Sequence, residues 1–293
     1  MVYSCLHTHS TFCDGQDTIE TLCQRAYQKG LVSLGFSSHA PVYRKTGFCT
    51  DWHIQEDRFE AYLDAVREAR QRWEGKIRIF LGLEIDYIQG LMGPGDRDYQ
   101  GLGLDYRIGS VHYVIPPRGS PFAVDDSPAV FEKGIREGFS HDPEALVEAY
   151  WDTVEGMILA GGFDILGHTD LIKKNKSPYE GKSWFSLESP GYQRRMRGIA
   201  DTIGASPLVV EVNTGGLNRS TIAETYPSCA LLRLLQGNQV PVIITADAHK
   251  AEDLDGHYPA ARETLVQAGY THGVLFEGTI NGVPQWRKEP LGE

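Results

Sequence analysis

Short apolar segments alternate with amphipathic segments along almost the whole chain, and this alternation limits the fold more than any other feature. Apolar, β-branched segments predict seven strands, at residues 2–9, 32–39, 77–85, 106–113, 163–168, 208–213 and 241–249. Amphipathic segments predict helices at residues 18–29, 56–73, 143–160, 192–203, 228–236 and 259–268. Because strands that alternate with helices form parallel sheets, we predict an α/β fold, a distorted TIM-like (β/α)7 barrel.

No linker divides the chain of 293 residues, so we predict a single domain over residues 1–293. Two segments interrupt the alternation. Residues 89–104 are glycine-rich and predict a loop, and residues 115–141 are long enough to form an insertion at the barrel mouth. Residues 274–293 predict a C-terminal hairpin or tail that turns at Asn281-Gly282 and forms an eighth strand or an edge.

Composition and missing motifs exclude several classes of protein. No apolar run is long enough for a membrane span, and the N-terminus lacks a secretion signal, so we expect a cytoplasmic protein. The five cysteines form no C-x-x-C pair, which argues against disulfides and a thiolate zinc site. A net charge of −11 argues against nucleic-acid binding. The sequence lacks phosphate-binding glycine loops and a G-x-S-x-G motif, so we predict no organic cofactor and no serine hydrolase.

Most histidines lie at one end of the predicted strands. Six of the ten are found at or just after the carboxyl end of a strand: His7, His9, His39, His112, His168 and His249. In a parallel barrel this end carries the active site, because every strand directs its last side chains toward the same mouth. The remaining four lie in predicted helices or loops, where we expect them at the surface: His53, His141, His257 and His272.

Carboxylates lie at the same end, and together with the histidines they predict a metal site. In the pairs His7-x-His9 and Asp247-x-His249 the side chains point to one face of a strand and can hold an ion from one side. Imidazole and carboxylate ligands without thiolate suit zinc, manganese or iron. The candidate ligands are His7, His9, Asp14, His39, Glu84, His112, His168, Asp247 and His249. They exceed the four that one zinc ion needs, so we predict two to three divalent ions, with Glu84 bridging a pair.

Other residues near the mouth have two interpretations each. Glu211, Asn213, Asp86 and Asp170 lie near candidate ligands and either support them or act directly. Cys5 precedes His7 by two residues, and we expect it to pack inside the barrel. Lys173, Lys174 and Arg219 follow the fifth and sixth strands, where each is either a surface charge or a substrate-binding cation.

Seven blocks, in order, resemble the PHP (polymerase and histidinol phosphatase) superfamily, and within it the histidinol-phosphate phosphatase branch. They are HTHSTFCDG, GFSSHAP, GLEIDY, GSVHYV, DILGHTDLIKK, EVNTGGL and TADAH. The resemblance implies a distorted (β/α)7 barrel with three metals at its mouth. It assigns the first metal to His7, His9, Glu84 and Asp247, the second to Glu84, His112 and His168, and the third to Asp14, His39 and His249. Asp14 departs from the histidine that this family often has at that position.

The charge of such a centre suits a phosphate ester. Three divalent ions, three carboxylates and a bridging hydroxide leave a net charge of about +2, which complements the charge of about −1.5 to −2 on a phosphate monoester. We therefore expect a metal-dependent phosphomonoesterase that attacks with the bridging hydroxide, with Glu84, Asp247 and His249 as catalytic residues. The resemblance implies hydrolysis of L-histidinol phosphate to L-histidinol and phosphate, a step of histidine biosynthesis.

Several alternatives stay open. A PHP-type phosphatase or nuclease that acts on a nucleotide or another small phosphate ester would share the metals. A metal-dependent amidohydrolase would also use an H-x-H motif, and a non-catalytic metal sensor would share the ligand set. The acidic composition disfavours the nuclease, and the cations at the mouth favour phosphate over amide substrates. We expect a small phosphate ester as the partner, with neither nucleic acid nor membrane. An acid at Asp125 or Asp126 would select amino-alcohol phosphates.

Overall fold

The computed structural model describes residues 3–48, 50–177 and 183–292. In that part of the chain seven parallel strands form one sheet. Their order is β1 (Ser4–Cys5), β2 (Ser33–Phe36), β3 (Arg78–Asp86), β4 (Tyr106–Ser110), β7 (Ile165–Leu166), β8 (Val209–Asn213) and β9 (Val242–Thr245). Each corresponds to one predicted strand, although the predicted start at Val2 lies outside the described residues. β3 has nine residues, as predicted, and the other six strands are shorter than predicted.

The two edges of this sheet meet just beyond β1 and β9. The backbone N–H of His9 donates to the carbonyl of Ala248 at 2.9 Å, and the N–H of Ala248 donates to the carbonyl of His7 at 3.1 Å. A parallel bridge between Thr8 and Ala248 accompanies these bonds. The sheet is therefore a nearly closed barrel, which confirms the predicted α/β barrel fold.

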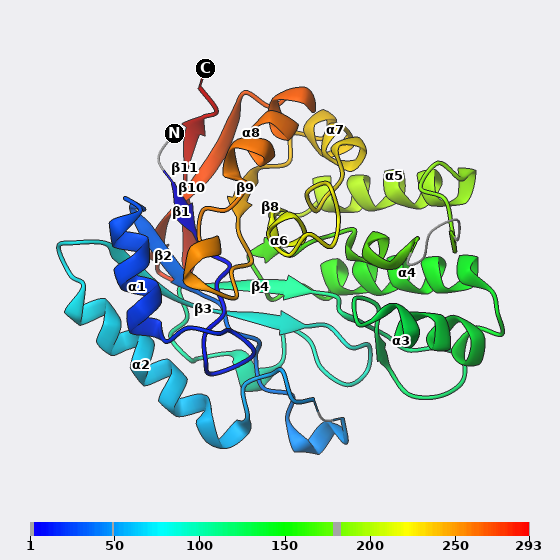
Figure 1. The fold of residues 1–293 in the computed structure, drawn as a ribbon, viewed down its shortest axis with the longest axis horizontal. Coiled ribbons are helices and arrows are strands. Elements are labelled where there is room, and N and C mark those ends of the chain that lie inside the picture. The colour runs from blue at the N-terminus through cyan, green and yellow to red at the C-terminus, as the bar shows by residue number, and fades with distance from the viewer. Residues whose placement is uncertain (1–2, 49, 178–182, 293) are drawn as a thin grey trace.

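Helices cover the outside of the barrel (Figure 1). They are α1 (Ile19–Gln28), α2 (Phe59–Arg72), α4 (Pro143–Ala160), α5 (Pro190–Gly204), α7 (Cys229–Gly237) and α8 (Tyr258–Gln267), with the short α6 (Gly215–Asn218) after β8. The helix α4 has the predicted bounds for physical reasons. The Asp142 side chain caps its first turn, Pro143 has no backbone N–H to leave unpaired, and Gly161 ends the helix with a φ of 67°.

The C-terminal residues form the predicted hairpin, with β10 (His272–Ile280) and β11 (Val283–Pro290) joined by a turn at Asn281-Gly282. It is a separate two-stranded sheet rather than an eighth barrel strand. The Phe276 ring lies 4.7 Å from Phe80 and 5.6 Å from Tyr106, which lie near the starts of β3 and β4. The hairpin therefore fills the amino end of the barrel, opposite the histidines.

The two irregular segments differ in structure. Residues 89–104 form a loop with one short 3-10 turn, Arg97–Tyr99. The segment 115–141 follows β5 (Tyr113–Val114) and contains β6 (Phe122–Ala123), which pairs with β5 in an antiparallel ladder. It continues into α3 (Pro128–Lys133) and a π turn, Gly134–Gly138.

Cys5 is buried, but the expectation that it packs inside the barrel was wrong. It lies in the apolar core that includes Leu22 and Cys23 of α1, whereas its neighbour Leu6 packs inside the barrel with Phe80 and Phe276. The four cysteines that the structure describes are free, and Cys49 lies outside the described residues. Within the described ranges, no helix combines the length and the apolar character that crossing a bilayer requires.

Candidate metal centre

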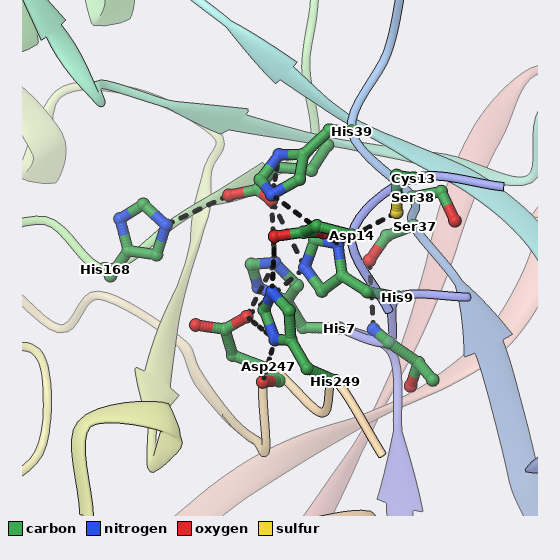
Figure 2. Close-up of polar contacts among 12 residues, drawn as sticks. His7, His9, Cys13, Asp14, Ser37, Ser38, His39, His168, Asp247 and His249 are labelled. Carbon is green, nitrogen blue, oxygen red and sulfur yellow. Dashed lines mark hydrogen bonds and ion pairs between the residues drawn. The ribbon is translucent and has the colours of Figure 1, made fainter. Parts of the chain in front are cut away.

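All nine predicted ligands come together at the carboxyl end of the barrel. Glu84 lies near the end of β3, and the others lie in the segments that follow β1, β2, β4, β7 and β9: His7, His9, Asp14, His39, His112, His168, Asp247 and His249. Figure 2 shows how six of these side chains point toward one centre from different strands: His7, His9, His39, His168, Asp247 and His249. Asp14 and His249 lie at the partly exposed rim, and the other seven are buried.

The Glu84 carboxylate lies in the middle of this cluster. Its Oε2 atom is 3.1 Å from His7 Nε2 and 3.4 Å from His9 Nε2. The same oxygen is 3.0 Å from His39 Nδ1. These four atoms are buried and have no hydrogen-bond partner in the described part of the chain. Unpaired buried polar atoms are costly, and lone pairs that face one another across about 3 Å suit a shared cation. The donor set therefore fits a divalent metal.

The other oxygen of Glu84 faces a second set of histidines. Its Oε1 atom lies 2.9 Å from His168 Nε2 and 3.6 Å from His112 Nε2. Asp247 approaches the first set, because its Oδ1 atom is 3.2 Å from His9 Nε2. Glu84 thus faces two ligand sets with its two oxygens, which is the geometry that a bridging carboxylate requires.

Ligand atoms form groups that parallel the three sets implied by the resemblance, except that Asp247 is in none of the groups found among the described residues. The groups whose atoms lie within 4.8 Å of one another include His7, His9 and Glu84; Glu84, His112 and His168; and His9, Asp14, His39 and His249. The third group gains His9, whose ring stacks on His249 at 4.2 Å. A further group joins His39, Asp86 and His112. In that group Asp86 already accepts a hydrogen bond from His112 Nδ1 at 2.8 Å.

Behind the ligands, Glu211 fixes the orientation of two histidines. This fully buried carboxylate lies 2.8 Å from His7 Nδ1 and accepts the backbone N–H of His168 at 2.7 Å. Asn213 Nδ2 and Thr245 Oγ1 also donate to it, at 2.9 and 2.8 Å. Because an ionised carboxylate only accepts, the neutral His7 ring carries its proton on Nδ1 and leaves Nε2 free for a cation.

Burial and neighbouring charges shift the pKa values of the histidines and of Glu84 in the centre. Burial opposes the charge on His7, but the surrounding carboxylates, above all Glu211, raise its pKa well above the usual value. Burial likewise opposes the charge on His112, yet nearby carboxylates raise its pKa to about 10. Burial and neighbouring histidines lower the pKa of His9 to about 3. Burial also opposes the charge on Glu84, but the histidines around it, His7 first, lower its pKa well below the usual value. The metal-free centre therefore holds protons that a cation would displace.

Arg219 lies directly over the cluster. Its Nη2 atom donates to Asp247 Oδ2 at 2.8 Å, and its Nη1 atom lies 3.1 Å from His249 Nδ1. The guanidinium also lines a cavity of about 330 Å³ above the metal ligands. Arg219 thus contacts two candidate ligands as well as the space that a substrate would fill.

The insertion forms one wall of that cavity. Asp125 and Asp126 line it, together with Trp52 and Lys174. Lys174 Nζ donates to the Asp125 carbonyl and lies 3.7 Å from its carboxylate. Asn175 Nδ2 donates to the carbonyl of Asp126 at 2.8 Å. Lys174 and Asn175 therefore fasten the acidic segment above the metal ligands.

Lys173 has neither of the two roles that the sequence predicted for it, a surface charge or a substrate-binding cation. Its side chain is fully buried and does not line the cavity. The ammonium donates to the Thr225 carbonyl at 2.7 Å, lies 3.1 Å from Asp170 Oδ2, and sits 5.0 Å from the centre of the Tyr226 ring. Asp170 likewise serves this buried network rather than the ligands.

The predicted surface location of His53 is also wrong. We expected a surface residue, as the structure shows for His141, His257 and His272. His53 is instead buried, and its Nε2 atom lies 2.7 Å from Asp86 Oδ2. The sequence carries no signal for this contact, because His53 lies in an irregular segment where periodicity cannot predict the direction of a side chain.

Imidazole groups arranged around a bridging carboxylate at the mouth of a parallel barrel are typical of a metal-dependent hydrolase. The chain belongs to the PHP domain family, whose model matches residues 6–215. This finding confirms the resemblance that the sequence blocks indicated.

Relatives and solved structures agree with this family. The chain is 26% identical over 264 residues to a protein of Deinococcus radiodurans named a probable histidinol-phosphatase, with 90% of this chain and 92% of that one covered. It is 25% identical over 272 residues to the histidinol-phosphatase of Bacillus subtilis, with 88% and 97% covered. The fold resembles the histidinol phosphate phosphatase of Lactococcus lactis, solved with zinc, L-histidinol and phosphate. That likeness has a TM-score of 0.72 and 17% identity, and covers 96% of this chain and 98% of that one.

Proposed function

We propose that the protein is a metal-dependent phosphomonoesterase that hydrolyses L-histidinol phosphate to L-histidinol and phosphate. The observation that carries this proposal is the set of unpaired, buried polar atoms around Glu84, which suits cations at the base of a cavity. The named relatives, which match nearly the full length of the chain, support the choice of substrate. A small phosphate ester is the partner that this proposal requires, and a cytoplasmic location remains our prediction.

The proposal assigns two to three divalent ions, zinc, manganese or iron, to the nine ligands. The first would be held by His7, His9, Glu84 and Asp247, the second by Glu84, His112 and His168, and the third by Asp14, His39 and His249. Such ions supply positive charge for a phosphate group and lower the pKa of water. The role of the chain is to fix these positions through Glu211 and Asp86, so that little reorganisation is needed when substrate binds.

The side chains around the cavity suggest how a substrate is oriented. Arg219 lines the cavity, where N–H groups of its guanidinium that are not bonded to Asp247 would contact phosphate oxygens. On the wall that the insertion forms, Asp125 and Asp126 offer carboxylates to a cationic amine. A molecule with a phosphate at one end and an ammonium at the other, as in histidinol phosphate, matches this polarity. Lys174 would act by holding the acidic wall in place.

We further propose that residues 1–293 act as one domain, with 115–141 as the mouth insertion and 274–293 as the hairpin that fills the opposite end. The test of the function is phosphate release from L-histidinol phosphate by purified protein, with metal content measured on the same sample. Turnover that is lost on chelation and restored by zinc, manganese or iron would support the proposal. Equal turnover in metal-free protein, or none with any of these metals, would contradict it.

A further inference from the structure

His53 lies in the irregular chain between β2 and α2, yet its ring is held on several sides. The ring centre is 4.1 Å from that of Trp52 and 6.3 Å from that of Tyr113. Its Nε2 atom lies 2.7 Å from Asp86 Oδ2, and its Nδ1 atom contacts Thr50 Oγ1. Both ring nitrogens therefore have specific partners, which packing alone would not require.

Asp86 connects His53 to a candidate metal ligand. Its Oδ1 atom lies 2.8 Å from His112 Nδ1 and accepts the backbone N–H of His112 at 3.3 Å. An ionised carboxylate cannot donate, so each ring carries a proton on the nitrogen that faces Asp86. When His112 is neutral, this arrangement leaves its Nε2 lone pair free, 3.6 Å from Glu84 Oε1.

The two supporting carboxylates of the centre are anchored in different ways. Glu211 accepts from Asn213 and Thr245 on barrel strands, in addition to the histidines that it orients. Among the described residues, the hydrogen bonds of the Asp86 carboxylate all involve His112 or His53. The orientation of Asp86 therefore depends on His53 in a way that the orientation of Glu211 does not.

We propose that His53 is a positioning residue for the metal that Glu84, His112 and His168 would hold. It anchors Asp86, and Asp86 fixes the tautomer and direction of the His112 ring. This role rests on the proposed metal-dependent function. It also makes a selective claim. Asp86 hydrogen-bonds the candidate ligand His112, whereas His53 only lies beside the His39 ring, at 5.4 Å, so loss of His53 weakens the metal position of His112 the most.

The test compares His53→Phe, which keeps an aromatic ring beside Trp52, with His53→Gln, which keeps an N–H donor. His272→Phe is the matched control, because His272 is exposed on β10 at the other end of the barrel. Metal per chain is measured after dialysis of the zinc-loaded proteins against chelators of increasing strength. Thermal unfolding of the chelated proteins reports folding separately from metal binding.

We expect His53→Phe to lose one metal equivalent under conditions where the wild type keeps all, with an affinity for that ion lowered by about 10- to 100-fold. His53→Gln retains part of that affinity, and His272→Phe behaves like the wild type. A folded His53→Phe protein that keeps every ion, or loses all ions equally, overturns the proposal.

If His53→Phe does not fold, Asp86→Asn and His53→Gln decide the question. Asp86→Asn is expected to lose the same single ion. If the Asp86→Asn protein keeps all of its metal, the contact between Asp86 and His112 does not support metal binding and the proposal is overturned. A wild-type protein that binds no metal at all contradicts the proposed function itself, and with it this role.

Discussion

Asp247 has a left-handed backbone conformation, with a φ of 48°, and Arg219 holds it there with two hydrogen bonds. The Nη1 atom of Arg219 donates to the Asp247 carbonyl at 3.1 Å, and Nη2 donates to its carboxylate at 2.8 Å. A residue other than glycine in this conformation costs about 1–3 kcal/mol, and such strain is concentrated at functional sites. Arg219 therefore fixes a candidate metal ligand as well as facing the cavity.

Arg219→Ala should lower kcat/KM by about 100-fold, some 3 kcal/mol, because it removes positive charge beside the phosphate. It should also weaken metal retention, since Asp247 loses both bonds. From the sequence alone we would expect unchanged metal content. Arg219→Lys should recover part of the activity, because lysine restores the charge without the two-pronged geometry.

Steady-state kinetics and metal analysis of the same preparations test these expectations for Arg219, with Arg72→Ala as an exposed control. Wild-type turnover in Arg219→Ala would show that Arg219 does not bind the phosphate group of the substrate.

Metal uptake should release protons, and the apparent metal affinity should rise with pH. His7 and His112 have raised pKa values in the metal-free protein, about 10 for His112, so both carry an extra proton at pH 7. A cation displaces these protons. The protonated rings stabilise the metal-free fold fully below the unfolded pKa of about 6.5, and this stabilisation fades as pH rises toward 10. Calorimetric titrations with zinc in buffers of different ionisation enthalpy measure the proton count. Zinc binding without proton release would contradict this description.

The acidic wall should select for a substrate amine. Asp126→Asn should lower kcat/KM for L-histidinol phosphate by about 10-fold, since a hydrogen bond to a charged group contributes about 1.5–3 kcal/mol. Turnover of an alkyl phosphate without an amine should not change. Asp125→Asn should have a smaller effect, because Lys174 already pairs with that carboxylate. The measurement is the ratio of the two kcat/KM values for each variant. An unchanged ratio in both variants would show that the amine is recognised elsewhere or not at all.

Substitution of Lys173 should lower stability, whereas substitution of the adjacent Lys174 should lower activity. Lys173→Met leaves Asp170 buried without its charge partner, and breaking such a pair costs about 3–5 kcal/mol of unfolding free energy. Its kcat/KM, measured where the protein is folded, should stay near that of the wild type. Lys174→Met should change stability little, because this side chain is only partly buried, but should lower kcat/KM for the amine substrate. Urea unfolding and kinetics together test this contrast, and the reverse pattern would contradict it.

The sequence predicted most of the fold because alternating apolar segments mark strands whose side chains face the core. It also predicted where Glu84 and the strand-end histidines converge, since parallel strands share one carboxyl end. It could not predict that His53 turns inward or that Lys173 is buried while Lys174 reaches the cavity. These side chains lie in irregular segments or tight turns, where direction depends on tertiary contacts rather than on periodicity.

The most direct test of the metal-dependent function is Glu84→Gln, which keeps the shape of the side chain that faces both ligand sets but removes its charge. The measurement is bound metal per chain and phosphate release from L-histidinol phosphate, made on wild-type and variant protein from the same purification. We predict more than one equivalent of divalent metal and chelator-sensitive turnover in the wild type, and the loss of at least one equivalent together with nearly all turnover in Glu84→Gln. Full metal content and full turnover in a folded Glu84→Gln protein would contradict the account.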